Sequence, residues 1–468
     1  MSSPAPAPRR DADVPDRRYF RTPATAPGPA GPQMLSAFWQ IRRNPLAYLE
    51  RVWREYGDVV QFPIPSPPSY LVVDPDGVRR VLQANARNYG KRTIQYRSLS
   101  LVTGEGLLTA DTDAWKRQRR LVQPAFHHES VNRVGDHVAI AGERLLDQWD
   151  SLPDGSVVDV DEAMMHAALE VVGRALFGTD LSGDAGRLAT ATLAALDVVI
   201  ARARTPVSPP SWLPTPDNRR LAAALRELDG AVTAMLAERG RRTADPSEPD
   251  MLDLLLSARD DTGAGLSRSE VRDQVVTFLV AGHETVASAL TWSWALLAEH
   301  PEQQERLAAE AHEALGGRFP GVADLPALPY ARAVFDEALR LYPPAWLITR
   351  RSHEADEVGG RSLPAGSLVI LSPWLLHRHP DLWDRPEQFA PERFLGDGVD
   401  RRGFIPFGAG PRLCIGRDFA YVEGVLLLAA VAARYRVDRV PGTPRPVAEP
   451  LVTVRPVAGL PLRLTRRG

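Results

Sequence analysis

The sequence contains a single cysteine, Cys414, among its 468 residues. An intramolecular disulfide and a zinc site built from several thiolates are therefore both excluded. A lone thiol fits a reducing compartment, because disulfide-stapled scaffolds belong to oxidising ones. Any thiol chemistry must therefore take place at this one position.

Long apolar runs are also missing. No stretch approaches the ~18 to 20 uninterrupted apolar residues that a membrane-spanning helix needs, and no charged-then-apolar signal pattern opens the chain. The formal net charge is only -2, so no overall attraction to nucleic acid or to an anionic membrane is expected. We therefore expect a cytoplasmic protein without a membrane span.

The first 33 residues are rich in Pro, Ala and Arg and have no hydrophobic period. Such a segment cannot bury enough apolar surface to stay ordered alone, so we expect a flexible leader over residues 1–33 and one domain over residues 34–468. Residues 45–56 then predict a helix, and residues 58–64 and 69–74 predict two strands.

From about residue 75 to 330 the apolar period is mostly near 3.6, which is typical of helices. The segment 205–218 interrupts it, because several prolines among polar residues forbid a continuous helix. After residue 352, short strand-like runs return, with one more helix at about 417–434. The predicted fold class is mainly α with minor β-sheets.

The cysteine stands in the run FIPFGAGPRLCIGRDFA, residues 404–420, just before that last helix. Backbone N–H groups at a helix start stabilise a thiolate. Gly408 and Gly410 allow tight turns, and Arg412 can pair with a carboxylate of a ligand. A nucleophilic cysteine enzyme is an alternative interpretation, although the sequence marks no particular histidine as its base.

A long helix is predicted from the capping-box pair Ser267 and Glu270 to Glu299, with a length of about 33 residues. One face carries small and apolar residues together with a threonine: Val271, Val275, Phe278, Gly282, Thr285 and Ala289. Thr285 can bond back to the carbonyl of residue 281. We expect Gly282 to leave a hollow, and Glu284 adds an ionisable group beside Thr285.

Further pairs lie at helical spacing. Glu337 and Arg340 are three residues apart and can form an ion pair, although such a pair is commonly exposed to solvent. Arg393 lies in the run QFAPERF, residues 388–394. Trp115 and Arg119 are four residues apart and offer an indole N–H and a guanidinium on one face.

These motifs resemble those of the cytochrome P450 family. The cysteine loop matches the haem-loop pattern F-x-x-G-x-R-x-C-x-G at every defined position, through Phe407, Gly410, Arg412, Cys414 and Gly416. The run AGHET, residues 281–285, resembles the family's oxygen-activation helix, with Val286 where many relatives carry a second threonine. The W-x-x-x-R, E-x-x-R and P-E-R-F motifs also occur in the family's order, so the resemblance spans roughly residues 35–468.

The resemblance implies a single large helical domain that encloses haem b, with Cys414 as the iron ligand. It places Trp115, Arg119 and Arg350 at the haem propionates, with Phe407 and Arg412 in the haem loop. Lys91 is a weaker candidate, since a lone basic residue in a loop is usually solvated. Glu337, Arg340 and Arg393 take a structural role behind the cysteine loop.

The implied activity is that of a haem-thiolate monooxygenase. It would insert one oxygen atom of dioxygen into a hydrophobic small molecule, such as a secondary metabolite, terpenoid or fatty acid, by hydroxylation or epoxidation. A thiolate donor on iron favours cleavage of bound dioxygen. Thr285 and waters would deliver the protons, and Glu284 would replenish them.

The sequence has no appended flavin or iron–sulfur domain. Electrons from NAD(P)H should therefore arrive through a separate ferredoxin or flavodoxin-type partner, and a surface around Arg412 and Arg417 could receive an acidic protein. We expect a monomer. A peroxide-driven hydroxylase or isomerase of the same fold, and a non-catalytic haem sensor or carrier, remain alternatives. The Glu284–Thr285 pair argues against both, because neither needs a proton relay for dioxygen.

Overall fold

The computed structural model describes residues 18–19, 22–63, 67–178, 183–203, 213–239, 249–396 and 398–467. The chain forms two compact units, each assembled from three separate segments. Unit 1 comprises residues 1–93, 336–414 and 448–455, and unit 2 comprises residues 94–335, 415–447 and 456–468. The predicted fold class, mainly helical with minor sheets, is confirmed. The predicted single domain over 34–468 stays a prediction.

Unit 1 holds most of the strands. Its helices are α1 (Gly31–Arg43), α2 (Pro45–Tyr56), α3 (Pro75–Arg79), the π-helix η1 (Arg80–Ala84), α14 (Pro373–Leu376), and the 3-10 turns η2 (Ala86–Asn88), η5 (Pro391–Phe394), η6 (Arg401–Gly403) and η7 (Gly410–Arg412). Its strands are β1 (Arg18–Tyr19), β2 (Thr22–Pro23), β3 (Val59–Phe62), β4 (Ser69–Val72), β5 (Tyr89–Gly90), β7 (Ile348–Ser352), β8 (Asp356–Val358), β9 (Arg361–Leu363), β10 (Leu368–Leu371) and β12 (Ala448–Pro450). The strand β13 (Val454–Pro456) ends at the unit boundary.

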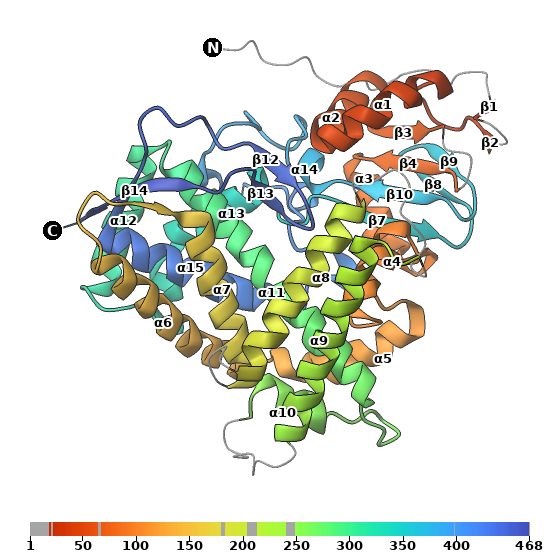
Figure 1. Cartoon of the computed structure of the whole chain (residues 1–468). Helices are drawn as coiled ribbons and strands as arrows, with labels where there is room; N and C mark the ends of the chain where they lie inside the picture. Colours follow the sequence, from red (N-terminus) through yellow and green to blue (C-terminus); the bar gives the residue numbers. More distant parts are fainter. Residues whose placement is uncertain are drawn as a thin grey trace. The chain divides into compact units, whose positions relative to one another are not determined.

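A five-stranded sheet in the order β3-β4-β10-β7-β5 organises unit 1. The strands β4 and β10 pair in parallel although nearly 300 residues separate them, as Leu368 opposite Ser69 shows, and Figure 1 draws them side by side. The other neighbours are antiparallel. β3 and β4 are buried along their whole length, as expected for strands covered on both faces.

The predicted helix and strands near the N-terminus are confirmed. The helix α2 has the predicted bounds, because Asn44 accepts a hydrogen bond from the Ala47 N–H, Pro45 occupies the first turn, and Gly57 follows the last residue with φ of 95°. The strands β3 and β4 lie within the predicted ranges, and residues 64–66 of the connecting turn lie outside the described residues.

The predicted leader needs correction at its C-terminal end. The backbone N–H groups of Thr25 and Ala26 donate to Gln61 Oε1, at 2.7 and 3.2 Å, and the Gln61 N–H donates to Pro27 O. Ala26 is fully buried, and α1 already begins at Gly31. Backbone groups that bind a strand do not need a hydrophobic period to be ordered. Residues 1–17 and 20–21 lie outside the described residues.

Unit 2 is almost entirely helical. Its helices are α4 (Ile94–Thr103), α5 (Thr112–Val122), α6 (His128–Asp150), α7 (Val160–Phe177), α8 (Gly183–Ala203), α9 (Pro216–Arg239), α10 (Met251–Ser257), α11 (Arg268–Leu297), α12 (Pro301–Leu315), α15 (Arg417–Arg434) and the 3-10 turns η3 (Gln123–Phe126) and η4 (Val322–Ala327). Its strands β6 (Val157–Asp159), β11 (Tyr435–Arg439) and β14 (Pro461–Arg466) form one antiparallel sheet. The helix α13 (Pro329–Leu341) carries the chain from unit 2 into unit 1.

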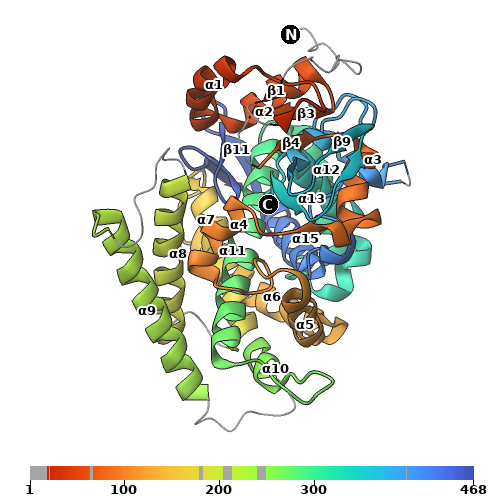
Figure 2. The same cartoon turned by 90° about the vertical axis from the view of Figure 1, so that its right-hand side faces the viewer.

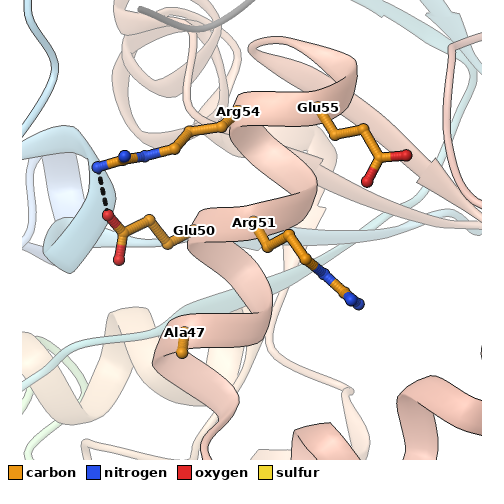
Figure 3. Close-up of a pocket in the computed structure, with 5 residues that line it drawn as sticks. All are labelled: Ala47, Glu50, Arg51, Arg54 and Glu55. Carbon is orange, nitrogen blue, oxygen red and sulfur yellow. Dashed lines mark hydrogen bonds and ion pairs between the residues drawn. The ribbon is translucent and has the colours of Figure 1, made fainter. Parts of the chain in front are cut away.

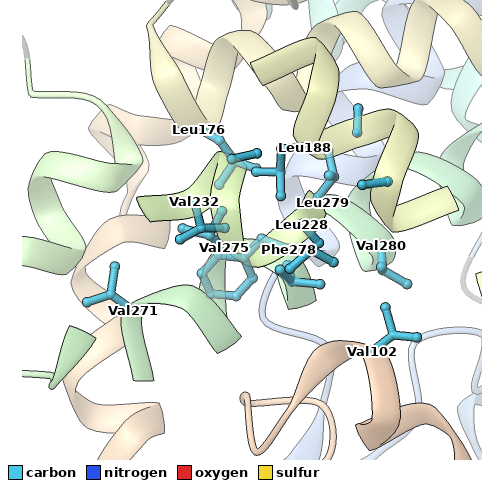
Figure 4. Close-up of a cluster of buried hydrophobic side chains, with 14 of the residues drawn as sticks. Val102, Leu176, Leu188, Leu228, Val232, Val271, Val275, Phe278, Leu279 and Val280 are labelled. Atoms are coloured by element: carbon cyan, nitrogen blue, oxygen red, sulfur yellow. The ribbon is translucent and has the colours of Figure 1, made fainter. Parts of the chain in front are cut away.

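The predicted long helix is present as α11, with the Ser267–Glu270 capping box at its start. It ends at Leu297 rather than at Glu299, because the chain turns through residues 298–300 before α12. Its apolar residues meet α7, α8 and α9 in one buried cluster that includes Phe278, Leu188 and Leu228 (Figure 4). The helices α8 and α9 run side by side in both views (Figures 1 and 2).

Two further sequence expectations meet the structure here. Residues 204–212 lie outside the described residues, but α9 already begins at Pro216, so the last three residues of the predicted loop belong to a helix. A proline in the first turn costs no hydrogen bond. Among the described helices, α11 alone is long and apolar enough to cross a membrane, and 83% of that apolar stretch is buried inside the protein, as in a core helix.

Candidate functional site

The cysteine loop closes on itself through backbone hydrogen bonds. The Gly408 N–H donates to Ile405 O and the Cys414 N–H donates to Phe407 O, both at 3.0 Å. Between them the 3-10 turn η7 spans Gly410–Arg412. The side chain of Cys414 is exposed. The loop therefore fixes the backbone on both sides of a cysteine whose sulfur remains accessible.

Two glycines give the loop its shape. Gly408 and Gly410 have φ values of 72° and 69°, in the left-handed region that favours glycine. They differ in their surroundings. A Cβ on Gly410 would lie 1.9 Å from the Leu82 carbonyl oxygen, whereas a Cβ on Gly408 would meet nothing within 4 Å. Gly410 is thus required twice, by its dihedral angle and by the close approach of η1.

The segment η1 that presses on Gly410 is held by one carboxylate. Asp356 on β8 accepts hydrogen bonds from Arg80 at 2.6 and 2.9 Å, from Tyr89 at 2.7 Å and from Asn85 at 3.0 Å. Burial would raise the pKa of Asp356, but these hydrogen bonds lower it to about 2. The carboxylate therefore stays charged at neutral pH and keeps the π-helical turn in place.

The predicted pairing of Glu337 with Arg340 is present, and it is not exposed to solvent. Arg340 Nε and Nη2 donate to the two carboxylate oxygens of Glu337, at 2.7 and 2.8 Å, and both side chains are 0% exposed. Arg393 Nε adds a bond of 3.1 Å to Glu337 Oε1. The Ala390 N–H donates to the same oxygen at 2.9 Å.

The remaining N–H groups of Arg340 bind three backbone carbonyls. Nη1 donates to His377 O and Pro386 O, at 2.9 and 2.6 Å, and Nη2 donates to Gln388 O at 3.1 Å. Its guanidinium also lies 5.0 Å from the centre of the Trp383 ring. A guanidinium has five N–H donors, and all five are used here.

Sequence reasoning missed His377. It is completely buried, Nδ1 lies 3.1 Å from Arg340 O, and its Nε2 accepts from the Ile405 N–H at 2.9 Å. The run LLHRHP, residues 375–380, carried no spacing that pointed to a site. A histidine between an apolar stretch and the P-E-R-F motif was the only available signal.

The other basic candidates of unit 1 are not solvated. Arg350 on β7 is 6% exposed and donates to Thr349 O at 2.8 Å, and Arg412 is half-buried in η7. Lys91 is only 7% exposed. This corrects the expectation that Lys91 is solvated.

Unit 2 carries the remaining predicted residues on two helices. Trp115 and Arg119 are half-buried one turn apart on α5, on either side of Lys116 and Arg117. On α11, Thr285 Oγ1 donates to Ala281 O at 2.6 Å, as the sequence predicted, and Glu284 is 8% exposed.

Three partly exposed residues interrupt the burial of α11. Between Gln274 and Ala295, only Ala281, Gly282 and Thr285 are less than fully buried. Offsets of one and four residues put them on one face of the helix, within about one turn of each other. The predicted hollow at Gly282 is wrong, because Val172 of α7 fills that side of the helix. A Cβ on Gly282 would lie 2.8 Å from Val172 Cγ2. Gly282 is required for helix packing, and the accessible surface lies beside it.

The structure brings together the cysteine loop, η1 and the Glu337 ion-pair cluster within unit 1, and it places Trp115, Arg119, Glu284 and Thr285 in unit 2. The described residues contain no group of three or more His, Cys, Asp or Glu side chains that could hold a metal ion. A single protein thiolate such as Cys414 can bind a metal whose other ligands come from a cofactor. A porphyrin supplies four nitrogens, so one accessible thiolate fits that group.

A surface hollow elsewhere does not belong to this site. It has a volume of about 680 Å³ and lies along α2, lined by Ala47, Glu50, Arg51, Arg54 and Glu55 (Figure 3). Arg54 pairs there with Glu50. Its lining is charged and includes none of the predicted site residues.

Replacing Gly410 should test the close approach of η1. Gly410→Ala should disrupt the loop, because the new methyl group meets the Leu82 carbonyl, at a cost of about 1 to 3 kcal/mol beyond the backbone strain. Gly408→Ala is the matched control, with only the left-handed strain of about 1 to 2 kcal/mol. Equal losses in the free energy of unfolding for the two variants would contradict this account.

Replacing Glu337 should test the buried ion pair. Glu337→Gln leaves the Arg340 charge without its counter-charge in a buried position, which costs about 3 to 5 kcal/mol. We expect a large drop in the folded fraction, measured by circular dichroism during thermal unfolding. Glu50→Gln is the matched control, because Glu50 pairs with Arg54 while both side chains stay 32% exposed. A Glu337→Gln protein as stable as this control would refute a stabilising role.

Comparisons with known proteins cover nearly the whole chain. The family profile described as Cytochrome P450 matches residues 26–460. The chain is 38% identical to cyclooctatin synthase of Streptomyces melanosporofaciens, over 97% of this chain and 98% of the relative. It is 36% identical to pentalenene oxygenase of Streptomyces avermitilis, over 95% and 97%.

Among solved structures, that of CYP175A1 from Thermus thermophillus aligns with a TM-score of 0.77 and 33% sequence identity, and the alignment covers 94% of this chain and 100% of that one. The predicted P450 fold and monooxygenase class are thereby confirmed. The chain belongs to the cytochrome P450 family.

Proposed function

We propose that this P450 monooxygenase oxidises a hydrophobic terpenoid, with Cys414 as the thiolate ligand of haem b. The observation that carries the proposal is the exposed side chain of Cys414 at the end of a loop whose backbone is fixed by hydrogen bonds. When bound, the haem supplies dioxygen activation: one oxygen atom enters the substrate and the other leaves as water, with the use of two electrons and two protons.

Five further residues would hold the cofactor. Arg350, Arg119 and Trp115 would donate to its propionates, because guanidinium and indole N–H groups suit carboxylates. Arg412 and Phe407 would contact it from the cysteine loop. The half-burial of Arg412, Arg119 and Trp115 supports this, since each side chain is sheltered yet accessible.

The substrate class is supported by the partly exposed residues of α11 and by the relatives. Ala281 and Gly282 offer no polar side-chain atom at this surface. Apolar sites recognise a ligand chiefly by shape and apolar contact. Two relatives are named cyclooctat-9-en-7-ol 5-monooxygenase and pentalenene oxygenase. A cyclic terpenoid secondary metabolite therefore fits better than a fatty acid.

Proton delivery is proposed for Thr285 and Glu284. Thr285 Oγ1 donates its hydrogen to Ala281 O, so its lone pairs remain available to accept a hydrogen bond from a water molecule. Glu284 is buried next to it and can exchange protons with that water. The pair would distinguish this enzyme from a peroxide-driven relative, which needs no such relay.

The cysteine assignment has a spectroscopic test. The reduced carbon-monoxide complex of the native protein should show the red-shifted band of a thiolate ligand, and Cys414→Ser should lack it. Thr285→Ala serves as the control that leaves the cysteine loop intact and should keep the band. A Cys414→Ser protein that binds haem with an unchanged spectrum would overturn the proposal.

Electrons should come from a separate protein, of ferredoxin or flavodoxin type, that is reduced with NAD(P)H. We expect no turnover from NADPH and the isolated chain, and turnover once a ferredoxin and its reductase are added. The acceptor surface would include Arg412 and Arg417. Substrate oxidation by the chain and NADPH alone would disprove this dependence.

The role of Thr285 is tested by coupling. Thr285→Ala should bind haem and substrate normally and still consume NADPH, yet release much of the reducing power as hydrogen peroxide, because the proton path is lost. NADPH consumed, peroxide released and product formed are measured in one reaction. Thr277→Ala is a control on the same helix, since Thr277 is 2% exposed and is not one of the partly exposed residues 281, 282 and 285. Unchanged coupling in Thr285→Ala would favour the peroxide-driven alternative.

A further inference from the structure

His377 connects the buried ion pair to the cysteine loop. Its backbone carbonyl accepts from Arg340 Nη1 at 2.9 Å, while its ring Nδ1 lies 3.1 Å from the Arg340 carbonyl oxygen. The two residues therefore bind each other through both side chains. On the other edge of the ring, Nε2 accepts from the Ile405 N–H at 2.9 Å.

These contacts define one tautomer. A carbonyl oxygen can only accept and a backbone N–H can only donate, so Nδ1 must carry the hydrogen and Nε2 must be unprotonated. A protonated ring would aim an N–H at the Ile405 N–H. Burial, together with the charges of Arg340 and Arg378, lowers the pKa of His377 to about 3, so the ring stays neutral under ordinary conditions.

Aromatic side chains fix the orientation of the ring. The His377 ring lies 5.5 Å from that of Phe404, which lies 4.9 Å from Phe394 and 6.2 Å from Trp383. Trp383 is the ring over which the Arg340 guanidinium lies. His377 therefore packs, through Phe404, on the same aromatic group that lies against the ion pair, and this packing restricts rotation of its ring.

The bond to Ile405 stands at the start of the cysteine loop. Ile405 O accepts from the Gly408 N–H, and Phe407 O accepts from the Cys414 N–H. The contacts therefore run from Arg340 through His377 to Ile405. Two residues later, the carbonyl of Phe407 binds the N–H of Cys414. No other side chain among the described residues of unit 1 bonds to both the ion-pair arginine and this loop in the contacts above.

We propose that His377 is a positioning residue for the thiolate: its neutral ring holds Ile405, and so the cysteine loop, at a fixed distance from the Glu337–Arg340 pair. The proposal rests on the proposed haem-thiolate function for its effect on the ligand, but its backbone contacts are independent of haem. The hydrogen bond from the Ile405 N–H to Nε2 holds the loop, and the hydrogen bond from Nδ1 to Arg340 O orients the ring.

Two amide substitutions separate the halves. In His377→Asn the amide N–H stands near the former Nδ1 and can still donate to Arg340 O, but nothing accepts from Ile405. In His377→Gln the amide oxygen can reach the former Nε2 position and accept from Ile405, while the bond to Arg340 O is lost. His379→Phe is the control, because His379 is buried two residues away and its Nε2 lies 3.4 Å from Asp58 Oδ1 rather than at the loop.

The first readout is hydrogen–deuterium exchange of the Ile405 amide in the haem-loaded proteins. We expect exchange about tenfold faster in His377→Asn, the effect of losing one ordinary hydrogen bond, and near-native exchange in His377→Gln and His379→Phe. The second readout is the thiolate share of the reduced carbon-monoxide complex, which should fall in His377→Asn and stay high in His377→Gln.

The outcomes are distinct. If His377→Asn and His377→Gln show the same Ile405 exchange and the same thiolate share, whether both native or both reduced, the positioning role is overturned. The proposed function stands as long as Cys414→Ser lacks the thiolate band. Should both variants fail to fold, nitrogen NMR of histidine-labelled native protein decides the matter. A His377 ring that is charged, or that carries its hydrogen on Nε2, contradicts the proposal.

Discussion

The cysteine side of unit 1 depends on a buried ion pair whose every donor is used. Glu337 and Arg340 are 0% exposed, and removing two charges from water costs far more than their attraction returns unless hydrogen bonds complete the shell. Here the shell is complete, with two bonds to the carboxylate and three to backbone carbonyls. The carbonyls belong to residues 377, 386 and 388, so one guanidinium fixes the stretch between α14 and η5.

This pair is linked to the cysteine loop by hydrogen bonds of His377 to Arg340 and to the backbone of Ile405. The position of the cysteine loop is set by His377 on one side and by η1 on the other. The carboxylate of Asp356 holds η1 through Arg80, Asn85 and Tyr89. Two buried carboxylates, Glu337 and Asp356, thus fix a loop that carries an accessible thiol, which suits a ligand that must keep one geometry through many turnovers.

In unit 2 the comparable constraint is close packing. The helix α11 is buried on almost all sides, and Gly282 lets Val172 of α7 approach. The helix therefore has little freedom to move, and the small accessible area at Ala281, Gly282 and Thr285 is held at a fixed level along it. A threonine hydroxyl that already donates to its own helix is directed by the backbone rather than by a flexible side chain.

The sequence by itself determined the features that depend on local chemistry. The bounds of α2 follow from Asn44, Pro45 and Gly57, and the start of α11 follows from Ser267 and Glu270. The cysteine-loop motif and the Glu337–Arg340 spacing were visible because each pattern uses fixed residue types at fixed separations. Only the tertiary structure decided which partners meet across long separations: Leu82 at Gly410, Val172 at Gly282, Gln61 at residues 25–27, and the burial of Lys91 and His377. These contacts join segments up to several hundred residues apart. No local pattern records them, because the residue that packs against a glycine or a backbone group lies in a different segment, where its contact leaves no periodic signal in the sequence.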